Sequence, residues 1–236
     1  MTAATPARPR PRLSSLLPIV AVFALIVACG PSSEDDGATA QERLARAAER
    51  IQQVTSVDFT LSHDEGETPL LPGVALQQAE GTVDGPERAI VDVEALITIT
   101  NTFVAMHIKV DGEDATMTDP LSGNPLPLQT SALPFNLRNL GMTLSGILNG
   151  IMDPSFSGDE RVDGVAGKVI SGTITGAEIK PLIPGAVDDL RQEIEVWVGE
   201  DDLPRKVRIA GLLLSNDADG VIRVLSLRNF DTARIP

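Results

Sequence analysis

The chain has 236 residues, of which 42% are hydrophobic but only 3% aromatic, with six Phe, one Trp and no Tyr. Its 33 acidic and 19 basic residues give a formal net charge of −14. One Cys excludes an internal disulfide, and with two His it excludes a usual Cys/His zinc site. The acidity and the shortage of aromatic rings exclude a typical nucleic-acid surface and argue against a sugar-binding face.

The amino terminus has the layout of a secretory signal peptide. Arg8, Arg10 and Arg12 precede an uncharged, mostly apolar run over residues 13–28. This run is shorter than the roughly 20 residues that a transmembrane helix needs. We therefore predict a signal peptide over residues 1–28; the alternative is a short amino-terminal anchor that stays attached.

The end of this run resembles a bacterial lipobox, with the sequence Ile26-Val27-Ala28-Cys29. The resemblance implies cleavage after Ala28 and diacylglyceryl (palmitate-type) lipidation of Cys29, followed by a polar tether over residues 29–38. Cleavage would leave 208 residues with a net charge of −17, because residues 1–28 carry three arginines and no acid. We expect an anchor in the cell membrane, on its extracytoplasmic face, in which the acyl chains hold the protein to the bilayer.

The first element expected after the tether is a helix from Thr39 to about Thr55. Thr39 and Glu42 have the spacing of a capping box. Apolar residues then recur at helical spacing, which predicts one buried face. They are Leu44, Ala47, Ala48, Ile51 and Val54.

The rest of the chain, within a domain placed at residues 39–236, is dominated by period-two alternation. Apolar and polar residues alternate over 57–61, 89–95, 193–198 and 221–227, which is typical of strands with one solvated face. Val-Asp-Gly recurs at 83–85, 110–112 and 162–164, and Asp-Gly favours tight hairpin turns. Calcium binding is the alternative for these acidic turns, but their spacing does not fit an EF-hand loop. A large, mostly antiparallel sheet is the predicted fold.

Two segments interrupt the strands. Pro120, Pro125, Pro127 and Pro134 predict a loop that cannot donate ladder hydrogen bonds. An apolar helical pattern follows over residues 137–151, weakened by Gly141, Gly146 and Gly150 at about 1 kcal/mol each. This helix is either an ordinary core helix or a mobile lid over an apolar cavity. A shorter helical piece, broken by Pro181 and Pro184, is expected over residues 177–190.

No familiar catalytic set is present. The sequence has no G-x-S-x-G elbow, no H-E-x-x-H motif and no candidate Cys nucleophile. His107 alternates with Met106 and Ile108, which predicts a solvent-facing imidazole, and His63 lies among acidic and turn residues at a strand end. We predict no enzyme, no catalytic residues, no metal site and no cofactor.

The order of these segments resembles the mycobacterial LppX/LprG family of cell-envelope lipoproteins. The resemblance implies an α+β fold in which a large curved antiparallel sheet, a half-barrel, carries helices on its concave face and encloses a hydrophobic cavity for acylated lipids. The segments that carry it are residues 51–61, 71–73 with 80–83, 144–153, 163–175, and 195–198 with 203–207.

The expected function is therefore a membrane-anchored lipoprotein that binds acylated lipid or glycolipid and transports it within the cell envelope, with an inner-membrane lipid transporter as a further partner and no nucleic acid. The alternatives are a non-catalytic accessory or assembly factor that binds a protein partner, and a secreted hydrolase. Aliphatic walls suffice to bind acyl chains, at about 25 cal/mol per Å² buried. The candidate cavity residues are Phe103, Met106, Ile108, Leu137, Leu140, Met142, Leu144, Ile147, Leu148 and Ile151.

Overall fold

The computed structural model describes residues 37–119 and 122–235, and residues 37–236 form one compact unit. The predicted signal peptide, Cys29 and most of the predicted tether lie outside the described residues. Within the described part, no helix is long and apolar enough to cross a membrane.

Helix α1 (Ala40–Gln52) begins at the predicted capping box. The Thr39 hydroxyl accepts a hydrogen bond from the Glu42 backbone N–H at 3.2 Å, and the Glu42 carboxylate accepts one from the Thr39 N–H at 2.7 Å. Leu44 and Ile51 are among the buried residues of the helix, so the predicted apolar face packs against the rest of the domain. The prediction of this helix is confirmed, although α1 ends three residues before Thr55.

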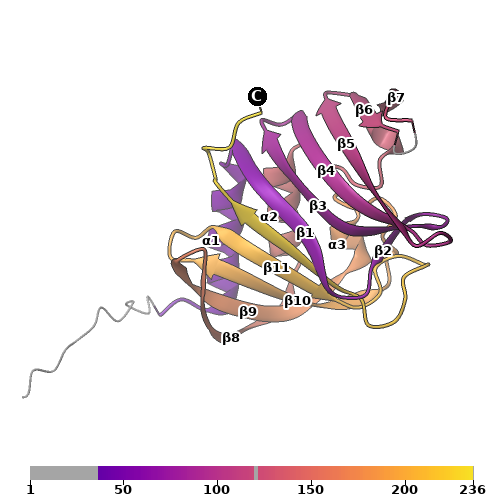
Figure 1. The fold of residues 1–236 in the computed structure, drawn as a ribbon. Coiled ribbons are helices and arrows are strands. Elements are labelled where there is room, and N and C mark those ends of the chain that lie inside the picture. Colours follow the sequence, from indigo (N-terminus) through magenta and orange to yellow (C-terminus); the bar gives the residue numbers. More distant parts are fainter. Residues whose placement is uncertain (1–36, 120–121, 236) are drawn as a thin grey trace, which may run out of the picture. The chain divides into compact units, whose positions relative to one another are not determined.

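Twelve antiparallel strands form one open sheet, in the order β7-β6-β5-β4-β3-β1-β12-β11-β10-β9-β8, with β2 paired to β3 outside this path (Figure 1). Most neighbours in the sheet are also neighbours in the chain; the exceptions are the pairings of β1 with β3 and of β1 with β12, at the centre of the sheet. The strands are β1 (Ser56–Glu65), β2 (Thr68–Leu71), β3 (Val74–Asp84), β4 (Arg88–Ile97), β5 (Thr102–Asp111), β6 (Asp114–Thr118), β7 (Pro125–Gln129), β8 (Met152–Val162), β9 (Val165–Thr175), β10 (Arg191–Gly199), β11 (Pro204–Ala210) and β12 (Ile222–Arg228).

The period-two pattern of the sequence corresponds to the two faces of this sheet. Along β4, Ala89, Val91, Val93 and Ala95 are buried, whereas Asp92 between them is exposed. The Asp-Gly pairs are the predicted turns: Gly85, Gly112 and Gly164 all have positive φ, between 65° and 86°. The prediction of a large antiparallel sheet built from hairpins is confirmed.

The proline-rich segment differs from the prediction of a loop, because Pro125 and Pro127 lie in β7, a strand at one end of the sheet. Pro125 is paired with Thr118 and Pro127 with Thr116. Because the two prolines are two residues apart, their ring nitrogens point to the same side of the strand. An edge strand can therefore contain both prolines on its unpaired side without losing a hydrogen bond to its neighbour.

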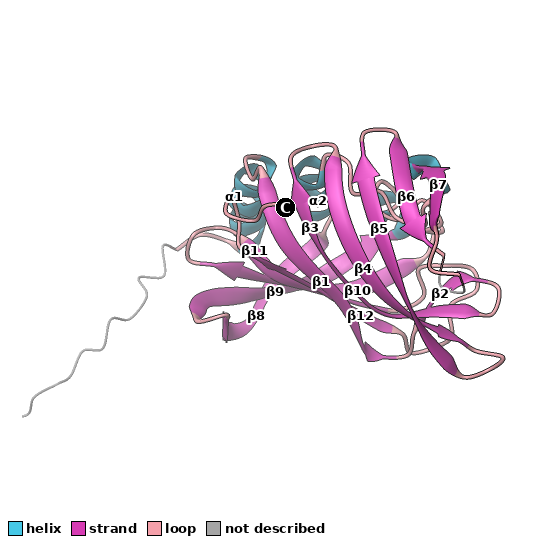
Figure 2. Cartoon of the chain, turned by 45° about the horizontal axis from the view of Figure 1, so that its top comes forward, coloured by secondary structure: helices cyan, strands magenta, loops and turns pink. Residues whose placement is uncertain are grey.

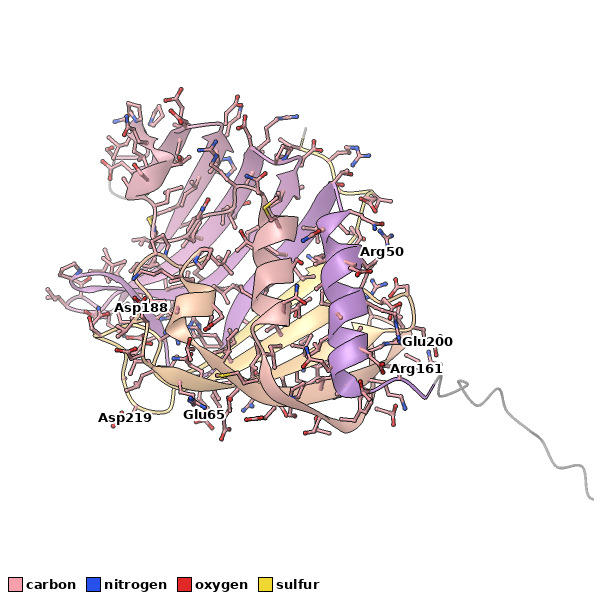
Figure 3. The ribbon with its side chains drawn as sticks, turned by 180° about the vertical axis from the view of Figure 1, so that it is seen from behind. Arg50, Glu65, Arg161, Asp188, Glu200 and Asp219 are labelled. Carbon is pink, nitrogen blue, oxygen red and sulfur yellow. The ribbon has the colours of Figure 1, made fainter. Side chains whose placement is uncertain are left out.

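The helices lie against the concave face of the curved sheet (Figures 2 and 3). Helix α2 (Leu140–Asn149) confirms the apolar helix after the proline-rich segment. The helix expected over residues 177–190 is mostly wrong: only α3 (Gly176–Ile179) is helical, and turns follow it because Pro181 and Pro184 interrupt the pattern. A single 3-10 turn, η1 (Thr130–Ala132), precedes α2.

Candidate functional site

A pocket of about 300 Å³ lies between α1, α2 and the ends of β1 and β3. This volume is at the lower end of the range for small-molecule sites. The walls are mainly aliphatic, and the polar lining residues are Gln52 of α1, Ser56 of β1, and Thr55 and Asn139 in the loops. The lining residues are Ile51, Gln52, Val54, Thr55, Ser56, Val57, Val83, Gly85, Pro86, Asn139, Leu140, Gly141, Met142 and Leu144.

The two helices that form one wall of this pocket approach closely at Gly141. A Cβ atom on Gly141 would lie 2.6 Å from the Ile51 carbonyl oxygen, so only glycine fits between the backbones. Below this contact, the Gln52 amide donates a hydrogen bond to the hydroxyl of buried Ser145 at 3.0 Å. The pocket therefore depends on one backbone contact and one polar contact between α1 and α2.

Three arginines lie next to lining residues of the pocket in the chain or bond to one of them. Arg50, toward the carboxyl end of α1 (Figure 3), precedes Ile51, and Arg138 precedes Asn139. Both make ion pairs, Arg50–Asp231 at 3.8 Å and Arg138–Glu87 at 3.1 Å. Arg234 donates to the Ser56 hydroxyl at 2.8 Å. Each of these guanidinium groups therefore already has a partner in the protein.

The structure brings only part of the predicted cavity set to this pocket. Leu140 and Leu144 line it, and Met142 stands at its mouth with 67% of its surface exposed. The remaining inward-facing members belong to the packed core or border it, without lining this pocket. These are Met106, Ile108, Leu137, Ile147, Leu148 and Ile151.

Phe103 is the exception among the predicted cavity residues, because the structure places it on the opposite face of the sheet. Alternation along β5 sets Phe103 with exposed Ala105 and His107, whereas Met106 and Ile108 face the helices. Phe103 is 59% exposed. Its ring therefore lies outside the pocket between α1 and α2.

Core side chains from the sheet and from the helices pack against one another. Ala95 and Ile194, on β4 and β10, are at most 1% exposed, as are Leu44 and Ile51 on α1. At these residues the space between the two layers is filled by the core itself.

A buried polar cluster, which the sequence pattern did not predict, lies at the other end of the inner face. Arg223 of β12 and Asp217 are joined at 2.5 Å, with 3% and 0% of their side chains exposed. Arg223 also donates to the Thr68 hydroxyl at 2.8 Å, and this hydroxyl lies 2.8 Å from the imidazole of His63. Burial lowers the pKa of His63, and the positive charge of Arg223 acts in the same direction. The sequence did contain one signal for this cluster, because Arg223 alternates in phase with the apolar residues Leu225 and Leu227 and so occupies an inward-facing position.

The described residues give few means for catalysis. No group of three or more His, Cys, Asp or Glu side chains that could hold a metal ion occurs among them. His107 is exposed as expected, and its Nδ1 lies 2.8 Å from the carboxylate of Asp92. Asp201 and Asp202, in the turn after β10, form ion pairs with Arg205 and Arg43 respectively, which is a structural role.

Comparison with family models gives a match to the LppX_LprAFG lipoprotein over residues 39–222. The chain belongs to this family. The match extends from the cap of α1 to the first residue of β12, so it includes both helices and every strand that contributes to the pocket. Membership of a lipoprotein family favours a binding or carrier role in the cell envelope over an enzyme.

Two solved structures show the same fold. The chain is similar to LprF from Mycobacterium bovis, with a TM-score of 0.60 and 17% identity, covering 83% of this chain and 94% of that one. It is also similar to the lipoprotein LppX of Mycobacterium tuberculosis, with a TM-score of 0.56, 17% identity, and coverage of 83% and 97%. Comparison with curated protein sequences gave no significant match. The predicted family and the curved half-barrel fold are confirmed.

Proposed function

We propose that this member of the LppX_LprAFG family is a lipoprotein, anchored through Cys29, that binds acylated lipid between its sheet and helices and carries it within the cell envelope. The acyl chains enter between α1 and α2, and an inner-membrane lipid transporter supplies or receives them. Cleavage after Ala28 and lipidation of Cys29 place the domain on the extracytoplasmic face of the cell membrane.

The observation that carries this proposal is the aliphatic pocket between α1, α2 and the sheet. Burial of apolar surface drives acyl-chain binding at about 25 cal/mol per Å² and requires no fixed polar partner. Leu140, Leu144 and Val57 provide such a wall. Arg50, Arg138 and Arg234, next to the pocket, are the candidate donors for the oxygen atoms of a glycolipid or phospholipid head group, in exchange for their present partners.

Loading of a complete lipid requires α2 to move. The pocket holds about 300 Å³, and core side chains of the two helices, such as Ile51 and Leu148, have essentially no exposed surface. Displacement of α2, with Leu144 and Leu148 on its buried face, would open that space and expose an apolar surface for the acyl chains. The lid hypothesis for this helix therefore becomes part of the proposed mechanism.

A second candidate is a non-catalytic accessory factor that binds an envelope protein and never opens. The close packing of part of the core favours it, because side chains such as those of Ala95 and Leu44 have essentially no exposed surface. The two candidates differ in one measurable respect, which is whether the domain takes up lipid.

The deciding experiment uses residues 30–236, purified without the anchor, because residues 37–236 form one compact unit. Native mass spectrometry and lipid extraction detect co-purified lipid, and a fluorescent acylated lipid measures uptake. The carrier proposal requires bound lipid or saturable uptake. A domain that carries no lipid and also takes up none would refute it and leave the accessory role.

A matched pair of variants locates the entry. Met142→Asp introduces a carboxylate at the mouth, at an exposed position that folding tolerates, and it should weaken uptake at least tenfold. Ile99→Asp introduces the same charge at a position that is 88% exposed and outside the pocket, and it should leave uptake unchanged. Equal effects of the two variants would show that acyl chains enter elsewhere.

A further inference from the structure

The outer face of the sheet, opposite the helices, has a groove of about 580 Å³ over β3, β4 and β5. Its polar and aromatic side chains alternate with the core residues of these strands, so they point away from the helices. These outward-facing residues are Gln78, Glu80, Asp92, Glu94, Phe103 and His107. The groove also reaches the β5 edge, where Val104, Ala105 and Met106 line it, together with Val93 of β4 and Thr118 of β6. It therefore combines acidic groups, one exposed aromatic ring and a strand edge.

One side of this groove is a strand edge without a partner in the described part of the chain. Strand β6 pairs with β5 only from Ile108 to Asp111, so residues 102–107 of β5 have β4 on one side and, among the described residues, no strand on the other. The Gly112 N–H donates to the Glu87 carbonyl at 3.0 Å. Because the hydrogen-bonding direction alternates along a strand, the backbone N–H and C=O groups of the even-numbered residues of β5 point toward β4. The N–H and C=O groups of Phe103 and Ala105 therefore face the free edge.

We propose that this edge and groove bind an extended, basic segment of a protein partner by strand addition. The backbone of the segment would bond to Phe103 and Ala105, and its alternate side chains would lie in the groove. An exposed strand edge is a ready template for such pairing, and neighbouring side-chain pockets supply specificity. This inference is independent of the lipid-binding proposal, because the groove shares no residue with the pocket between α1 and α2.

Charge selects the class of partner. Glu80, Asp92 and Glu94 line the groove, and His107 already lies 2.8 Å from the Asp92 carboxylate. Lysine or arginine side chains that alternate along an added strand would meet these carboxylates. A second copy of this chain would instead place the same acidic residues against them in a protein of net charge −14, which disfavours self-pairing.

The two ends of the sheet contrast with this edge. At one end, Pro125 and Pro127 in β7 remove N–H donors. At the other end, β8 contains Pro154 and two register shifts, between Met152 and Ser155 and between Phe156 and Gly158. Such features prevent unwanted pairing. Residues 102–107 of β5 have no proline and no shift in their pairing with β4, which is consistent with an edge kept open for a partner.

The test uses the domain over residues 30–236 and a synthetic ten-residue peptide of alternating Lys and Val. Amide hydrogen exchange measured by NMR should show that the peptide slows exchange at Phe103 and Ala105 by at least tenfold at saturation. A peptide of alternating Glu and Val should give no protection. Adsorption of a cation to an acidic protein would shift resonances without this local protection, and that outcome would overturn the proposal.

Two pairs of variants complete the test. Ala105→Pro removes the edge N–H and should weaken peptide binding about tenfold, whereas Ala105→Ser keeps the N–H and should bind as the wild type does. Glu94→Gln should weaken binding about threefold. Glu193→Gln removes the same charge from an exposed position on β10, outside the groove, and should have no effect.

Two results would contradict the proposal. Equal affinities of the Ala105→Pro and Ala105→Ser variants would show that backbone pairing plays no part. Protection of Phe103 and Ala105 that rises with protein concentration, without any peptide, would identify a second copy of the chain as the occupant.

Discussion

Two glycines of α2 should respond in opposite ways to the same substitution. A Cβ on Gly146 would have no atom within 4 Å, so Gly146→Ala gains helix propensity without a clash and should stabilise the domain by about 0.5–1 kcal/mol. A Cβ at Gly141 would lie 2.6 Å from the Ile51 carbonyl oxygen. The backbones of α1 and α2 would have to separate, which should outweigh the propensity gain and destabilise the domain by about 1–3 kcal/mol.

Urea denaturation followed by circular dichroism, with thermal melting as a second measurement, checks this difference. For a domain of about 200 residues, 1 kcal/mol corresponds to a change in Tm of roughly 2–4 °C. The Gly146→Ala variant should melt higher and Gly141→Ala lower than the wild type. If both variants shift in the same direction, the close contact between α1 and α2 does not control the stability of this region. If opening requires α2 to unfold locally, Gly146→Ala should also slow lipid uptake up to about fivefold.

Three further predictions concern the buried polar cluster and the first helix. Burial lowers the pKa of His63 below 6.5, so the folded state binds fewer protons than the unfolded state, and the stability of the fold decreases as the pH drops below about 6.5. His63→Gln should therefore reduce the loss of unfolding free energy measured between pH 7.5 and pH 5.5. An unchanged loss would contradict this role of His63. Asp217→Asn leaves the buried Arg223 guanidinium without its counter-charge and should cost about 3–5 kcal/mol in urea denaturation, whereas a cost below about 1 kcal/mol would mean that the pair contributes little. Thr39→Ala removes one half of the capping box with Glu42 and should cost about 1 kcal/mol, measured in the same way, and no change would show that the cap is dispensable.

Local rules predicted most of the secondary structure. Thr39 and Glu42 marked the start of α1 because a capping box is complete within four residues. The Asp-Gly turns were equally predictable, because Asp163 and Gly164 both adopt the positive φ that few other residues tolerate. In each case the contacts that decide the structure lie close together in the sequence.

The proposed sites depend on contacts between distant residues, which the sequence pattern does not reveal. The pocket combines Ile51, Val83 and Leu140, which lie on three separate elements. The Arg223–Asp217 pair reaches Thr68 across more than 150 residues of chain. Strand alternation could, however, have corrected one candidate: the pattern that sets His107 outside the core also sets Phe103 there.

The contrast between α1 and α2 indicates which helix moves during loading. Helix α1 has a complete capping box, and Arg43 ties it to the turn after β10 through the Gly199 carbonyl at 2.7 Å and the Asp202 carboxylate at 3.2 Å. Helix α2 begins at Asn139 in the left-handed region, has no side-chain cap and has no acidic residue in its first turn. Since local opening begins where the contacts are weakest, α2 should move away while α1 and the sheet stay in place. This movement would admit acyl chains and leave the outer groove on β5 unchanged.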